Sequence, residues 1–65
     1  MASDTFTRLF LDLPVHERQK LAALDFAEYI VLGNLTWEVV ATCVGNPSES
    51  LRELHRTSTA MLEGN

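Results

Sequence analysis

The stretch LTWEVVATCVGNPSESLRELHR, residues 35–56, predicts two helices joined by a tight turn. Thr36 can cap the first helix, because a threonine hydroxyl accepts a hydrogen bond from a free backbone N–H of the first turn. Gly45 can adopt the left-handed backbone that commonly ends a helix. We therefore expect a short helix at about 36–44.

The second helix of this stretch has a strong start signal. Asn46 can act as its N-cap, Pro47 suits the first helical position, and Glu49 follows three residues after the cap. Gly64 marks the end, so we expect a helix at about 47–62. The positions expected to face inward across both helices are Val40, Ala41, Val44, Leu51 and Leu54.

A further helix is expected at the N-terminus. Phe6, Leu9 and Phe10 recur at the spacing of one helix face, which predicts a helix at about 4–12. Its N-cap would be Ser3 or Asp4.

The longest helix is expected over 14–32. Pro14 suits its first turn, and Gly33-Asn34 can end it with a left-handed cap. Its apolar residues span an arc of roughly 220°, well beyond the stripe of about 100° that a surface helix needs. We therefore expect it to be covered from two sides, by the chain's own core and by a second copy. The residues expected at this dimer or partner interface are Phe6, Leu9, Phe10, Phe26, Tyr29 and Ile30.

Length and charge set the broad class. The 65 residues form one domain, 1–65, and a chain of this size buries only about 60% of its unfolded surface, which favours oligomerisation. The sequence has no apolar run of 18 or more residues and no secretory signal, so we expect a soluble, cytoplasmic protein without a membrane partner. The net charge of −4 opposes sequence-independent binding to nucleic acid. Any DNA binding must therefore be local or shared between subunits.

The spacing of small and aliphatic residues within 35–56 resembles the helix-turn-helix family. Ala41 is followed four residues later by Gly45 and ten later by Leu51. A small residue lets two helices cross closely, and a glycine accepts the turn. The likeness extends over residues 13–56, where LP-x-x-ERQ-x-L, LT-x-E-x-VA-x-x-VG and ESLRELHR are similar to the fourth region of sigma factors and to LuxR-type domains.

The four expected helices and the absence of an alternating strand pattern predict an all-α domain. The resemblance implies that the helix at 47–62 lies in the major groove of DNA. The spacing of Ala41, Gly45 and Leu51, together with the wide apolar arc of 14–32, indicates a small helix-turn-helix transcriptional regulator of bacterial or phage type that binds DNA as a homodimer. The residues that the resemblance places against DNA are Thr36, Trp37, Ser48, Glu49, Ser50, Arg52, Glu53 and Arg56.

Charge on the same helix supports a second hypothesis. Glu49 and Glu53 cancel Arg52 and Arg56, although a glutamate can accept a hydrogen bond from cytosine. The acidic charge, the small size and the excess of apolar surface are also typical of a protein-interaction module. The alternative is therefore an acidic helical module that modulates a regulatory or transcription complex by binding a protein partner.

Enzymatic chemistry is not expected. Cys43 is the one cysteine and is expected to be a small buried residue, while His16 and His55 are expected at the surface. The sequence contains no glycine-rich phosphate loop, no zinc-ligand spacing and no nucleophile with a base at helical spacing. We therefore expect no metal, no cofactor and no small-molecule substrate.

Overall fold

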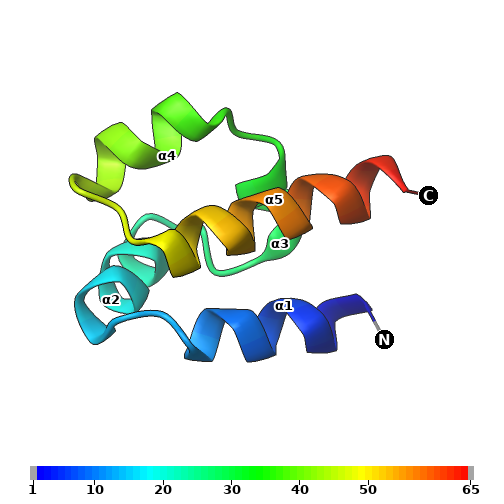
Figure 1. The fold of residues 1–65 in the computed structure, drawn as a ribbon, viewed down its shortest axis with the longest axis horizontal. Coiled ribbons are helices and arrows are strands. Elements are labelled where there is room, and N and C mark those ends of the chain that lie inside the picture. Colours follow the sequence, from blue (N-terminus) through cyan, green and yellow to red (C-terminus); the bar gives the residue numbers. More distant parts are fainter. Residues whose placement is uncertain (1, 65) are drawn as a thin grey trace.

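Five helices make up the part of the chain that the structure describes. The computed structural model covers the backbone of residues 2–64 and the side chains of residues 4–64. The described residues contain no strand, which confirms the all-α prediction. In Figure 1, α5 runs through the middle of the molecule with α1 on one side and α4 on the other. The helices are α1 (Ala2–Leu11), α2 (Val15–Ala23), α3 (Tyr29–Gly33), α4 (Trp37–Val44) and α5 (Glu49–Glu63).

The prediction of one helix over 14–32 is wrong, because a turn separates α2 from α3. Asp25 in this turn has a left-handed φ of 63°. The N–H of Phe26 donates to the oxygen of Leu21 at 2.8 Å, and the N–H of Asp25 donates to the oxygen of Ala22 at 3.2 Å. This pair of bonds is a Schellman motif, which ends a helix at a left-handed residue. Glycine usually takes that position, and here an aspartate does.

The break lets apolar residues of both segments reach the same core. Leu21 of α2 and Leu32 of α3 are both fully buried. The left-handed cap expected at Gly33 and Asn34 is also wrong, since Asn34 has a φ of −83°. Its side-chain Nδ2 donates to the oxygen of Ile30 at 2.7 Å instead, and this bond satisfies a carbonyl group in the last turn of α3.

Helix α1 begins earlier than expected. It starts at Ala2, so Asp4 lies in its first turn rather than at the N-cap. The expected role of the Ser3 side chain lies outside the described residues. An acidic residue in the first turn still interacts favourably with the helix dipole.

The predicted ends of α4 are confirmed. Thr36 is its N-cap, and Oγ1 of Thr36 accepts a hydrogen bond from the N–H of Val39 at 3.3 Å. Gly45 follows the last residue of the helix with a φ of 75°. That left-handed backbone is open to glycine without a steric penalty.

Helix α5 begins two residues later than predicted, and its N-cap is Ser48 rather than Asn46. Asn46 has a φ of 23° in the turn, whereas Ser48 has the extended backbone of an N-cap, with φ −83° and ψ 167°. Oγ of Ser48 accepts a hydrogen bond from the N–H of Leu51 at 3.2 Å. The turn from α4 into α5 therefore occupies residues 45–48.

The core lies where the other helices meet α5. Val40, Val44, Leu51 and Leu54 are buried as predicted, while Ala41 is half-buried. Among the described helices, none is both long enough and apolar enough to cross a membrane. The buried apolar side chains are Phe6, Leu13, Leu21, Leu32, Val40, Val44, Leu51 and Leu54.

Candidate functional site

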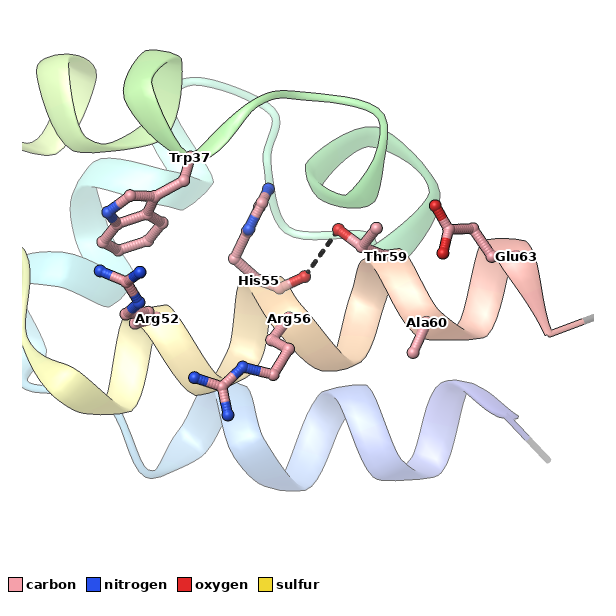
Figure 2. Close-up of a pocket in the computed structure, with 7 residues that line it drawn as sticks. All are labelled: Trp37, Arg52, His55, Arg56, Thr59, Ala60 and Glu63. Carbon is pink, nitrogen blue, oxygen red and sulfur yellow. Dashed lines mark hydrogen bonds between the residues drawn. The ribbon is translucent and has the colours of Figure 1, made fainter.

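A groove of about 380 Å³ runs along the exposed side of α5 beside the start of α4. Figure 2 shows the side chain of Trp37 extending from the start of α4 toward Arg52 and His55 of α5, while that of Arg56 extends to the other side of α5 in this view. The groove combines an indole ring with two guanidinium groups, an imidazole, a hydroxyl and a carboxyl group. Its lining residues are Trp37, Arg52, His55, Arg56, Thr59, Ala60 and Glu63.

Trp37 is held between two side chains of α5. Cζ of Arg52 lies 5.4 Å from the centroid of the indole ring, within the range of a cation–π interaction. The ring of His55 lies 5.7 Å from that of Trp37, centroid to centroid, at an angle of 49°. Arg52 itself is exposed, so its N–H groups can also donate to a ligand in the groove.

His55 is half-buried, so its expected place at the surface is wrong. Nε2 of its ring lies 2.6 Å from the backbone oxygen of Leu35. Because a carbonyl oxygen can only accept, Nε2 carries the proton and donates. The hydroxyl of Thr59 donates to the oxygen of His55 at 3.0 Å (Figure 2). It also lies 3.5 Å from the oxygen of Gly33. The contacts of His55 with Leu35 and of Thr59 with Gly33 tie the middle of α5 to the end of α3 and the segment that follows it.

Arg56 is the more loosely held of the two arginines. Its Nη1 lies 3.3 Å from Oε1 of Glu53, and the two side chains are 68% and 55% exposed. An ion pair so open to water contributes little stability. Arg56 can therefore exchange Glu53 for a phosphate or a carboxylate of a partner at small cost.

The first turn of α5 is anchored from α2. Glu17 is fully buried, and both of its carboxylate oxygens accept from Ser48, Oε2 from the N–H and Oε1 from the hydroxyl, each at 2.7 Å. Ser48 is half-buried, so its hydroxyl is already engaged within the chain. The sequence did not indicate this contact, because 31 positions separate the two residues.

The structure gathers part of the set that the sequence resemblance placed against DNA. Trp37, Arg52 and Arg56 lie in one groove. Thr36 is exposed beside it as the cap of α4. The other members lie in the first turns of α5: Ser48, Glu49, Ser50 and Glu53.

Three of the expected interface residues, Phe6, Tyr29 and Ile30, line a second groove of about 320 Å³. Phe6 belongs to the core, with 5% of its side chain exposed, whereas Ile30 is 51% exposed. The rings of Phe6 and Tyr29 lie 6.4 Å apart. Leu9, Phe10 and Phe26 are half-buried against the core. The residues that line this groove are Phe6, Thr7, Ala27, Glu28, Tyr29 and Ile30.

The outer side of α4 corrects one further expectation. Cys43 is exposed rather than buried. It lies with Glu38, Val39 and Thr42 along a shallow groove of about 260 Å³. Within residues 4–64, no three His, Cys, Asp or Glu side chains cluster closely enough to hold a metal ion.

Comparison of the chain with protein families, with curated proteins and with solved structures gave no match. The groove beside α4 and α5 is therefore the feature that bears on function. An exposed helix with two arginines beside a tryptophan can bind an anionic or aromatic partner, and the open shape suits an extended surface rather than an enclosed substrate.

Proposed function

We propose that this chain is a small helix-turn-helix regulator that binds DNA through α4 and α5. The observation that carries the proposal is the placement of Arg52 and Arg56 in one groove, four residues apart on the exposed side of α5. In such domains the second helix reads base edges while the first lies across the phosphate backbone. Thr36 and Trp37 at the start of α4 occupy the phosphate side in this arrangement.

The test measures fluorescence anisotropy of labelled duplexes selected from a random-sequence pool, over a range of salt concentrations. The double change Arg52→Ala and Arg56→Ala is expected to abolish sequence preference and to lower the salt slope of the remaining binding by up to about two, one for each arginine that contacts a phosphate. Arg8→Ala is the matched control, because Arg8 is exposed on α1, outside the groove. Absence of binding by the wild-type chain, or an equal loss with Arg8→Ala, contradicts the proposal.

We also propose that the regulator acts as a homodimer, associating through the smaller groove between α1 and α3. The exposed Ile30 beside the aromatic rings of Phe6 and Tyr29 supports this interface. A two-fold dimer would set two copies of α5 about one turn of DNA apart, roughly 34 Å. Light scattering tests the proposal, and a mass of 7.3 kDa at micromolar concentration would correspond to a single chain.

A second candidate function is docking of the same groove onto a protein. The observation that favours it is the charge of α5, whose exposed acids Glu49, Glu53 and Glu63 outnumber Arg52 and Arg56. Tryptophan and arginine are also the residues most enriched at the energetic centres of protein interfaces. The salt slope separates the two functions, because counterion release makes DNA binding fall steeply with salt.

A further inference from the structure

We infer that Glu17 is a positioning residue for the groove of α5: it fixes the first turn of that helix and, through it, Arg52. As a statement about DNA binding, the inference rests on the proposed function. As a statement about the geometry of α5, it stands on the hydrogen bonds of Ser48 alone. Glu17 itself is fully buried and touches no partner directly.

Ser48 is held by every polar group that it has. Its N–H and its hydroxyl donate to Glu17, and the hydroxyl accepts from the N–H of Leu51 at 3.2 Å. Its carbonyl oxygen accepts from the N–H of Arg52 at 3.2 Å. Glu17 of α2 is therefore connected to Arg52 in the groove through Ser48 and the first turn of α5.

The burial of Glu17 makes this placement specific. A carboxylate is rarely buried completely unless its oxygens are satisfied, because an unpaired charge in the interior is costly. Both oxygens are satisfied by Ser48. If α5 began one residue earlier or later, these donors would move away and leave the carboxylate unpaired. The contact therefore favours one starting residue for α5.

The turn before α5 needs such an anchor. Asn46 is held at a φ of 23°, a conformation that residues other than glycine adopt uncommonly, although asparagine does so more readily than most, and surrounding contacts help to hold it there. The two bonds from Ser48 to Glu17 lie two residues further along the chain. They hold the strained turn closed and set the direction in which α5 leaves it.

The contact between Arg52 and Trp37 makes the position of the first turn of α5 measurable. The guanidinium of Arg52 lies over the ring of Trp37, which is the single tryptophan of the chain. A shift of the first turn of α5 would move the arginine away from the indole. The fluorescence of Trp37 therefore responds to Glu17 although the two residues lie on different helices.

The experiment compares Glu17→Gln with Glu38→Gln, which removes the same charge from an exposed position on α4. Glutamine keeps the size but replaces one acceptor oxygen with a donor, so it cannot accept both bonds from Ser48. We expect Glu17→Gln to change the emission of Trp37 and to speed hydrogen exchange at the N–H of Leu51 by about fivefold or more, the effect of losing one N-cap. Glu38→Gln leaves both signals as in the wild type.

DNA affinity supplies the readout that loss of charge alone cannot explain. Removing a carboxylate weakens repulsion of phosphates and should raise affinity, as expected of Glu38→Gln. Displacement of Arg52 should instead lower the affinity of Glu17→Gln. If Glu17→Gln does not fold, Ser48→Thr and Ser48→Ala replace it, with Trp37 emission as the readout because Ser48→Ala removes the acceptor of the Leu51 N–H directly. The threonine variant keeps the hydroxyl and the wild-type emission, and the alanine variant shows the altered emission.

A folded Glu17→Gln variant with the Trp37 emission and the Leu51 exchange rate of the wild type overturns the inference. The same Trp37 emission in Ser48→Thr and Ser48→Ala also overturns it. Failure of the wild-type chain to bind any duplex overturns the proposed function instead. In that case emission and exchange still decide whether Glu17 positions the first turn of α5. The two failures are therefore distinguishable.

Discussion

At the scale of single residues, Gly33 lies where α3 packs closely against α5. A Cβ atom placed on Gly33 would lie 2.8 Å from the backbone oxygen of Ser58 and 2.7 Å from Cδ1 of Leu62. Leucine can turn aside, but the backbone of a packed helix cannot. Glycine is required here by contact rather than by its backbone angles.

We predict that Gly33→Ala destabilises the fold by about 1–3 kcal/mol, the usual cost of overpacking, although alanine is the better helix former. Urea unfolding followed by circular dichroism measures the loss. Adding Leu62→Ala should not restore stability, since the clash with Ser58 remains. A Gly33→Ala chain as stable as the wild type would show that α3 packs less closely on α5.

The residues of the groove differ in how far the sequence could reveal them. The sequence was sufficient to predict Trp37, Arg52 and Arg56, because an exposed helix face and a capped turn can be recognised from local residue spacing. His55 was misplaced, since its half-buried position depends on the carbonyl group of Leu35, a contact across 20 positions. Glu17 was missed for the same reason. Long-range hydrogen bonds leave no periodic signal in a single sequence.

At the scale of elements, the turn between α2 and α3 is the largest departure from the predicted fold. The apolar arc predicted for 14–32 was wide because the segment was treated as one helix. In the structure α2 and α3 each turn their own apolar side toward the core. Helix α2 ends at a left-handed residue, Asp25, and the sequence did not indicate this because aspartate adopts left-handed backbone far less often than glycine. By contrast, Thr36 and Gly45 showed the ends of α4 directly.

Opposite effects of two substitutions test this turn. Asp25→Gly should stabilise the protein by about 0.5–1 kcal/mol, because glycine accepts the φ of 63° without steric cost. Asp25→Ala should destabilise it, since alanine has neither that freedom nor the short polar side chain. Both variants lose the same charge. In a continuous helix the order would reverse, with alanine favoured over glycine by about 1 kcal/mol, so unfolding midpoints of the pair decide between a turn and a helix.

At the scale of the whole molecule, the groove lined by Trp37 and the groove lined by Ile30 use different helices. The larger groove belongs to α4 and α5, and the smaller is lined by α1, α3 and the residues just before α3. A partner bound at one of these grooves therefore leaves the residues that line the other groove uncovered. A chain of 65 residues with little buried surface gains stability from association, and this favours a dimer that leaves α5 exposed.

Ile30→Asp tests this arrangement. Because Ile30 is 51% exposed, a charge there should change the stability of the single chain by no more than about 0.5 kcal/mol. In a dimer it would bury a carboxylate against apolar surface on both sides of the two-fold axis, so light scattering should show the mass fall to 7.3 kDa. Val39→Asp is the matched control, since Val39 is 43% exposed on α4, outside both grooves.

The same two variants separate association from DNA binding. A dimer holds two copies of α5 on one duplex, so loss of the dimer should weaken binding to a two-half-site duplex far more than binding to a single half-site. Val39→Asp should preserve both the dimer and this preference. A dimer that survives Ile30→Asp but dissociates with Val39→Asp would contradict this arrangement. The interface would then lie on the outer side of α4, where Cys43 is exposed. The groove between α1 and α3 would have no role in association.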